Sequence, residues 1–134
     1  MAEQDQYRDR PNTGQLTDVP GFLVGQVERV GDGWLTGVSV VIPPTGSIGA
    51  VDVRGGGPGT HETDALDPTT LVATVDAVVL TGGSAYGLVA ASGAQRWFEE
   101  QGRGFGVDGG VVPIVPAAVT SPYVLMKKWV IKLR

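Results

Sequence analysis

Glycine is concentrated in two turns of this chain, and each turn follows an extended stretch. The chain has 134 residues and 21 glycines, which is roughly twice the usual share. One cluster lies in residues 51–63, together with Arg54, Glu62 and the only histidine, His61. The other occupies residues 82–87, directly after an apolar run. Because glycine tolerates positive φ and lets a backbone or a ligand approach closely, these turns indicate a site built from backbone amides.

The second glycine cluster lies between a strand pattern and a helix pattern. Residues 76–80 are a compact apolar run, and residues 84–101 have the best helical pattern of the chain, with small side chains in its first half. Gly102 follows at the position where a glycine commonly ends a helix. Small residues let a helix pack closely on a sheet. The pattern therefore predicts an α/β fold with one main helix over residues 84–101.

Further elements are predicted on both sides of this unit. Residues 34–42 are rich in Val and Thr and read as a strand, and residues 48–53 are expected to return beside it as a hairpin. Residues 16–30 read as two short extended pieces, broken by Pro20-Gly21. Asp67-Pro68 resembles a helix start, which predicts a short helix over residues 68–75.

Prolines interrupt the last apolar run of the main body. Pro113 and Pro116 lie within residues 111–119. Proline cannot donate a main-chain hydrogen bond, so this run is expected to be an edge strand or irregular.

The two ends of the chain differ from the body in composition. Residues 1–13 are polar and are expected to be a disordered leader. They lack the apolar core of a signal peptide, and no apolar run reaches membrane-spanning length, so a cytoplasmic protein without a membrane partner is expected. Residues 120–134 hold four of the ten basic residues and form a divergent basic-apolar tail. Residues 14–119 are the expected domain, and the tail is not expected to form a core strand of its sheet.

Composition also limits the function classes. The net charge of −4 argues against a nucleic-acid partner, because such binding needs a basic surface. The chain has no cysteine and one histidine, so we predict neither a metal site nor a cofactor. No complete set of catalytic side chains can be assembled from the sequence.

The turn after the apolar run is the first candidate site. Gly82, Gly83, Ser84 and Tyr86 would offer free N–H groups and the positive end of a helix to an anion or oxyanion. The spacing fits neither a dinucleotide fingerprint nor a P-loop, and Ser84 lacks the surroundings of a nucleophile elbow. For the turn taken alone, a tight strand–helix connection with Ser84 as N-cap is the commoner explanation.

A charged site around the other glycine cluster is the second candidate. Arg54 and Glu62 lie close in sequence to Asp52 and His61. A surface salt bridge and solvated loop residues are the commoner explanation for such a group.

The segments taken in order resemble the N-terminal part of the L-aminopeptidase/D-esterase family, which includes the DmpA-type and β-peptidyl aminopeptidases. The matching segments are residues 12–25, 37–44, 51–63, 66–68, 76–88 and 112–119. The resemblance implies an αββα sandwich like that of N-terminal-nucleophile hydrolases. It also implies a precursor that cleaves itself before a Ser or Thr, whose freed amine then acts as the base for its own hydroxyl.

The family function implied is release of N-terminal residues from peptides, amides or esters. The implied nucleophile lies downstream of the matched region, so we expect no catalytic residue here, a truncated chain and no activity of the chain alone. Gly82, Gly83, Ser84, Tyr86, Arg54 and Glu62 would be substrate-site walls. The expected partners are a small peptide or amide substrate and either further copies in a homo-oligomer or the missing β fragment, whose absence should leave apolar surface exposed.

Two other interpretations remain open from the sequence. The chain could be a non-catalytic remnant or interaction module that needs a partner chain. It could also be an anion-binding domain that uses the turn after the apolar run. After Val119 the sequence departs from the family pattern, so no family residue is carried over to the tail.

Overall fold

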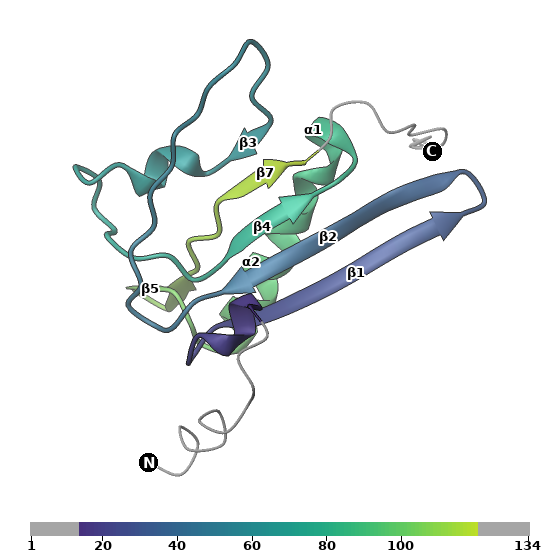
Figure 1. Ribbon diagram of the computed structural model, residues 1–134. Helices are drawn as coiled ribbons and strands as arrows, with labels where there is room; N and C mark the ends of the chain where they lie inside the picture. The colour runs from purple at the N-terminus through teal and green to yellow at the C-terminus, as the bar shows by residue number, and fades with distance from the viewer. Residues whose placement is uncertain (1–13, 121–134) are drawn as a thin grey trace.

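The computed structural model describes residues 14–120 as a mixed sheet with a helix on one face (Figure 1). The five strands lie in the order β1-β2-β4-β7-β3, and a separate two-stranded sheet pairs β5 with β6. The expected α/β class is confirmed at this level. The leader at residues 1–13 and the tail beyond Thr120 lie outside the described residues.

Strands β1 (Leu23–Gly31) and β2 (Trp34–Ile42) form a long antiparallel hairpin. Asp32 and Gly33 connect them, and both have positive φ, at 51° and 83°. A two-residue Asp-Gly loop of this kind matches the twist of the strands that it joins. The predicted strand at residues 34–42 is confirmed with the same bounds. The prediction of an extended piece before Pro20 is wrong, because Leu16–Asp18 is a short 3-10 helix.

The predicted return of residues 48–53 beside β2 is wrong. Both edges of β2 are occupied, one by β1 and the other by β4 (Val78–Thr81). After Pro44 the chain turns, and the Ser47 N–H donates to the Pro44 carbonyl at 3.2 Å. It then runs beside the loop before β4, where the Val75 N–H donates to the Ser47 carbonyl at 2.9 Å.

The predicted helix over residues 68–75 is also wrong, although its predicted cap is present. The Asp67 carboxylate accepts hydrogen bonds from the hydroxyl and the N–H of Thr69. Both bonds hold the pKa of Asp67 below its usual value, and the bond from the Thr69 hydroxyl has the larger effect. The chain then continues without a helix, because Thr and Val, which are poor helix formers, fill most of the following positions. The nearest helical turn is instead the 3-10 helix Thr63–Leu66.

The centre of the sheet combines parallel and antiparallel pairs. Strand β4 confirms the strand predicted near residues 76–80, and it pairs in parallel with β7 (Ala117–Val119). Strand β3 (Thr60–His61) pairs antiparallel with the other side of β7. Strand β7 is therefore not an edge strand. The two prolines of this run lie instead in the irregular segment between β7 and β6 (Gly110–Val112), which pairs with β5 (Phe105–Val107).

The predicted main helix is confirmed as α1 (Ser84–Gly87) followed directly by α2 (Val89–Glu100). Gly102 has φ of 66°, and its N–H donates to the Glu99 carbonyl at 2.9 Å. The Arg103 N–H donates to the Phe98 carbonyl at 2.9 Å. These two bonds form a Schellman motif, which satisfies carbonyl groups that the helix end would leave open.

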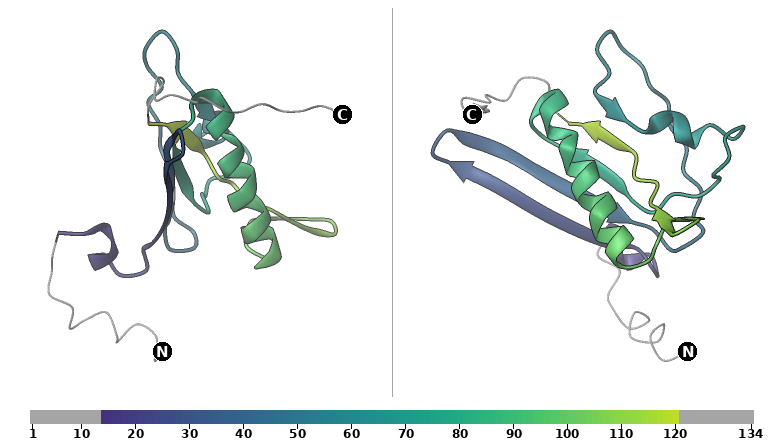
Figure 2. Two further views of the ribbon diagram at one scale, coloured as in Figure 1. Left: turned by 90° about the vertical axis from the view of Figure 1, so that its right-hand side faces the viewer. Right: turned by 180° about the vertical axis from the view of Figure 1, so that it is seen from behind.

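The core lies between this helix and one face of the sheet (Figure 2). Its buried members are Ala77, Val79, Ala91, Phe98, Val115 and Ala117. Directly opposite residues of paired strands share a face, so the register of Val79 with Val40 places the alternate residues, including Ser39 and Leu80, on the opposite face.

No described α-helix covers that opposite face, here called the open face (Figure 2). It carries Val30, Leu35 and Leu80, which are all exposed. The apolar exposure expected of this chain is therefore present on the open face.

Candidate functional site

A groove of about 740 Å³ runs over the open face toward the end of β4. Its floor is formed by strands β1, β2 and β4, and its end is formed by the first two glycines of the turn after β4. The lining residues include Gln26, Glu28, Leu35, Thr36, Leu80, Gly82, Gly83 and Thr120. Two of the six predicted site residues, Gly82 and Gly83, thus lie in the groove.

The turn after β4 is fixed by close main-chain contacts. The Gly82 N–H donates to the Gly37 carbonyl at 2.8 Å, and the buried Thr81 hydroxyl donates to the Gly87 carbonyl at 3.2 Å. A Cβ on Gly87 would collide with the Gly82 carbonyl, and a Cβ on Gly82 would lie 2.6 Å from the Thr36 hydroxyl. Glycine is therefore required at position 87, where the obstacle is main chain, whereas at position 82 the Thr36 side chain would have to rotate to make room.

The start of the helix differs from the sequence interpretation in which Ser84 is the N-cap. Gly83 is the N-cap, with φ of 85°, and Ser84 is already the first helical residue. The predicted role of Ser84 as N-cap is therefore wrong. Ser84 also has positive φ, at 55°, which is costly for a residue with a Cβ and which is often found at functional sites. Tyr86 follows in the same helical turn, with 64% of its surface exposed.

Gly83→Val is expected to destabilise the chain by about 1–3 kcal/mol, because valine would be forced into a positive-φ conformation. Gly106→Val is the matched control, since Gly106 lies in strand β5 without a positive φ, and a Cβ added there would meet open space. Urea unfolding followed by circular dichroism measures both changes. A Gly83→Val midpoint equal to that of the control would show that the turn is not strained.

The two glycine-rich segments lie at the same end of the sheet, on either side of β7 (Figure 1). Because β4 and β7 are parallel, Thr81 pairs with Val119 at their shared C-terminal end. The Val119 N–H also donates to the Gly59 carbonyl at 2.9 Å, which places the end of the first glycine cluster there. Thr120 completes this end, because its N–H donates to the Thr81 carbonyl at 2.9 Å.

Arg54 and Glu62 do not line the groove. Arg54 forms an exposed ion pair with Asp52, with 2.7 Å between Nε and Oδ2. The Glu62 carboxylate accepts hydrogen bonds from the Val115 N–H at 2.8 Å and from the Gln95 side chain at 3.2 Å. These contacts connect the start of the 3-10 helix Thr63–Leu66 to helix α2 and to the segment before β7. Participation of either residue in substrate binding stays a prediction.

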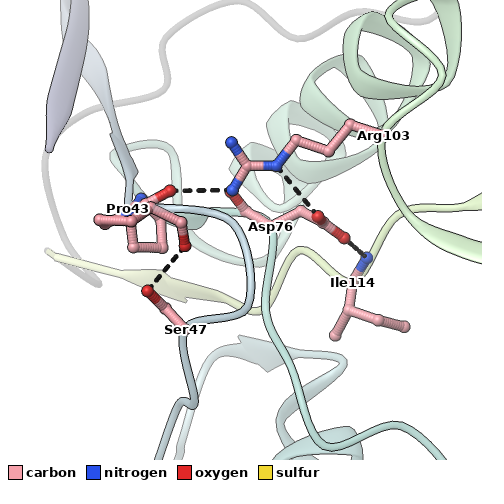
Figure 3. Close-up of polar contacts among 6 residues, drawn as sticks. Pro43, Ser47, Asp76, Arg103 and Ile114 are labelled. Atoms are coloured by element: carbon pink, nitrogen blue, oxygen red, sulfur yellow. Dashed lines mark hydrogen bonds and ion pairs between the residues drawn. The ribbon is translucent and has the colours of Figure 1, made fainter. Parts of the chain in front are cut away.

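A second polar cluster, which sequence reasoning missed, lies at the opposite end of β4 (Figure 3). The Asp76 carboxylate accepts from Arg103 Nε at 3.1 Å and from the Ile114 N–H at 2.9 Å. Arg103 Nη2 also donates to the Pro43 carbonyl at 2.9 Å and to the Asp76 carbonyl at 3.0 Å. The only local signal was the position of Arg103 directly after Gly102. The cluster joins the helix end to β2, β4 and the segment before β7, and it lies away from the groove.

Metal-binding and membrane-spanning features are both lacking in residues 14–120. Within this part no group of three or more His, Asp or Glu side chains could hold a metal ion. No helix there is long and apolar enough to cross a membrane.

This chain belongs to Peptidase family S58, whose family model matches residues 14–124. The resemblance stated from the sequence is thereby confirmed. An uncharacterized aminopeptidase of Mycobacterium tuberculosis (strain ATCC 25618 / H37Rv) is 58% identical over 110 residues, which are 78% of this chain and 32% of that protein. An uncharacterized aminopeptidase of Mycobacterium leprae (strain TN) is 57% identical over 110 residues, which are 78% of this chain and 30% of that protein. The chain thus spans about a third of the length of these curated relatives.

Proposed function

We propose that this chain forms the substrate-site wall of an aminopeptidase-family hydrolase and does not carry its nucleophile. The reaction would release N-terminal residues from peptides, amides or esters by acyl transfer to a Ser or Thr at a newly formed N-terminus. The observation that carries the proposal is the family match over residues 14–124, which corresponds to about a third of the relatives. The nucleophile would lie in the part of the relatives that this chain does not span.

The turn after β4 is the part of the wall closest to the chemistry in this proposal. The start of a helix offers main-chain N–H groups, and the helix dipole there favours a negative charge. The turn is fixed by the hydrogen bonds of the Gly82 N–H and the Thr81 hydroxyl, and its N–H groups would bind a substrate carbonyl or its developing oxyanion. Ser84 and Tyr86 would contact the substrate beside this turn.

The open face would be the inner face of an αββα sandwich. An apolar sheet face is stable when another layer covers it, and stacked sheets lie about 10 Å apart. The exposed Leu35 and Leu80 fit such an inner face. In the full-length family the second sheet would come from the β fragment, and the groove would then lie between the two layers.

The purified chain alone is expected to show no hydrolysis of aminoacyl amides or esters, because the proposed nucleophile is absent from it. Release of p-nitroaniline from a panel of aminoacyl p-nitroanilides measures this directly. Ser84→Ala is the matched control. Turnover that is lost in Ser84→Ala would overturn the proposal and identify Ser84 as a nucleophile.

A non-catalytic interaction module is the second candidate, and the exposed open face favours it. Such a module would bind a partner chain and would leave any substrate unchanged. Thermal stabilisation by inorganic phosphate would instead favour an anion-binding domain that uses the turn after β4.

A further inference from the structure

Strand β1 forms a long edge of the five-stranded sheet, and no other described strand covers it (Figure 1). It has nine residues, all exposed, and none of them is proline. Within residues 14–120, β2 is its one pairing partner. The opposite edge strand, β3, has two residues. A long exposed edge presents unpaired N–H and C=O groups that can accept another strand, so β1 is the edge on which a further strand would pair.

We propose that β1 pairs antiparallel with β1 of a second copy of this chain, about a twofold axis at Val27. An axis perpendicular to the sheet keeps the open faces of both copies on the same side. Gln26 of each copy then lies opposite Glu28 of the other copy, and Val24 of each copy lies opposite Val30 of the other copy. The two five-stranded sheets would then form one continuous sheet.

The side chains of β1 are self-complementary in this register. The Gln26 amide has two N–H donors; one bonds the Ser39 hydroxyl at 3.3 Å, which leaves the other for the Glu28 carboxylate of the second copy. Val24 and Val30 would cover each other on the open face. Gly25 would lie opposite Arg29, and a Cβ at Gly25 would have no neighbour within 4 Å, so the long arginine stem has room there.

The neighbouring registers that keep the same faces are less favourable. Moving the axis to Glu28 would place the two Glu28 carboxylates directly opposite each other, which is destabilising. Moving it to Gln26 would place Glu28 opposite Val24, where the carboxylate would lose water without gaining a partner. The register centred on Val27 avoids both problems.

Cysteine cross-linking tests this register, because the chain has no cysteine of its own. In Val27→Cys the two thiols would lie directly opposite, with Cβ atoms about 5 Å apart. The matched control is Val30→Cys, since Val27 and Val30 are 66% and 68% exposed. The two Val30 positions would be six residues apart along the pair, or about 20 Å.

With a short bismaleimide, Val27→Cys is expected to form covalent dimer at least about tenfold faster than Val30→Cys, in line with these separations. Equal rates for the two variants would overturn the proposal, and so would absence of a Val27→Cys dimer.

Charge variants at Gln26 give an independent readout by sedimentation equilibrium. Gln26→Lys would place an ammonium opposite Glu28 twice in each dimer, whereas Gln26→Glu would place two carboxylates there. Gln26→Lys is expected to dimerise roughly tenfold more tightly than Gln26→Glu.

Two sedimentation results would contradict the proposal. One is a monomer at every concentration. The other is equal association of the two Gln26 variants without Val27→Cys cross-linking, which would assign self-association to the open face. Neither result bears on the proposed function, which the hydrolysis assay tests separately.

Discussion

Gly87→Ala is expected to destabilise the chain by about 3 kcal/mol or more, at the upper end of the costs of overpacking. The added methyl group would collide with the Gly82 carbonyl, and the Thr81 hydroxyl lies 3.0 Å from the same position. Main-chain atoms cannot move aside as a flexible side chain can. The strand–helix connection would have to open, and with it the end of the groove.

Gly93→Ala is the matched control for this change. Gly93 lies in α2, the part of the main helix that follows α1. A Cβ added at Gly93 would have no neighbour within 4 Å. Alanine is the better helix former, so Gly93→Ala should stabilise the chain by about 0.5–1 kcal/mol. Urea unfolding measures both variants, and a Gly87→Ala midpoint at or above that of the unmodified chain would show that the turn is not closely packed.

Asp76→Ala is expected to cost about 3–5 kcal/mol, the usual effect of removing one partner from a buried ion pair. The Asp76 and Arg103 side chains are 13% and 22% exposed. The change would leave the Arg103 guanidinium without its counter-charge and the Ile114 N–H without its acceptor. Such a loss is a large fraction of the total stability of an ordinary domain.

Asp52→Ala is the control for this second prediction. It removes the ion pair between Asp52 and Arg54. The Asp52 side chain is 66% exposed and the Arg54 side chain is 84% exposed. Exposed pairs contribute about 0–1 kcal/mol, so the midpoint should change little. Equal losses for Asp76→Ala and Asp52→Ala would show that the cluster at the start of β4 does not hold the fold together.

The elements that sequence reasoning predicted well are specified by nearby residues. The main helix has small residues along its first half and Gly102 after its end, and both features act within the helix itself. Strand β2 is bounded by Gly33 on one side and Pro43 on the other. Local chemistry of this kind is visible in one sequence.

Some of the errors arise where distant segments decide the outcome. Nothing near residues 48–53 shows that β4 already occupies the free edge of β2. The error after Asp67 has a local cause instead: the cap was recognised, but the Thr and Val residues that follow it are poor helix formers. The contacts of Asp76 with Arg103 join residues 27 positions apart, and no sequence pattern pairs them.

Only part of the candidate site was predicted, because the rest depends on contacts between distant segments. Gly82 and Gly83 lie at the end of the groove as the strand–turn–helix pattern indicated. Glu62 was singled out for its charge, but its carboxylate accepts hydrogen bonds from Val115 and Gln95. The groove floor comes from three strands, which only the tertiary arrangement brings together.

We expect residues 14–119 to be able to serve as the site wall of a family S58 aminopeptidase. The most direct test is a chimera in which these residues replace the matching segment of the Mycobacterium tuberculosis relative, which is 58% identical over 110 residues. We expect the chimera to hydrolyse an aminoacyl amide that the intact relative cleaves, with kcat/KM within about tenfold, or 1.4 kcal/mol in transition-state binding. A folded chimera that has lost hydrolysis altogether would contradict the claim.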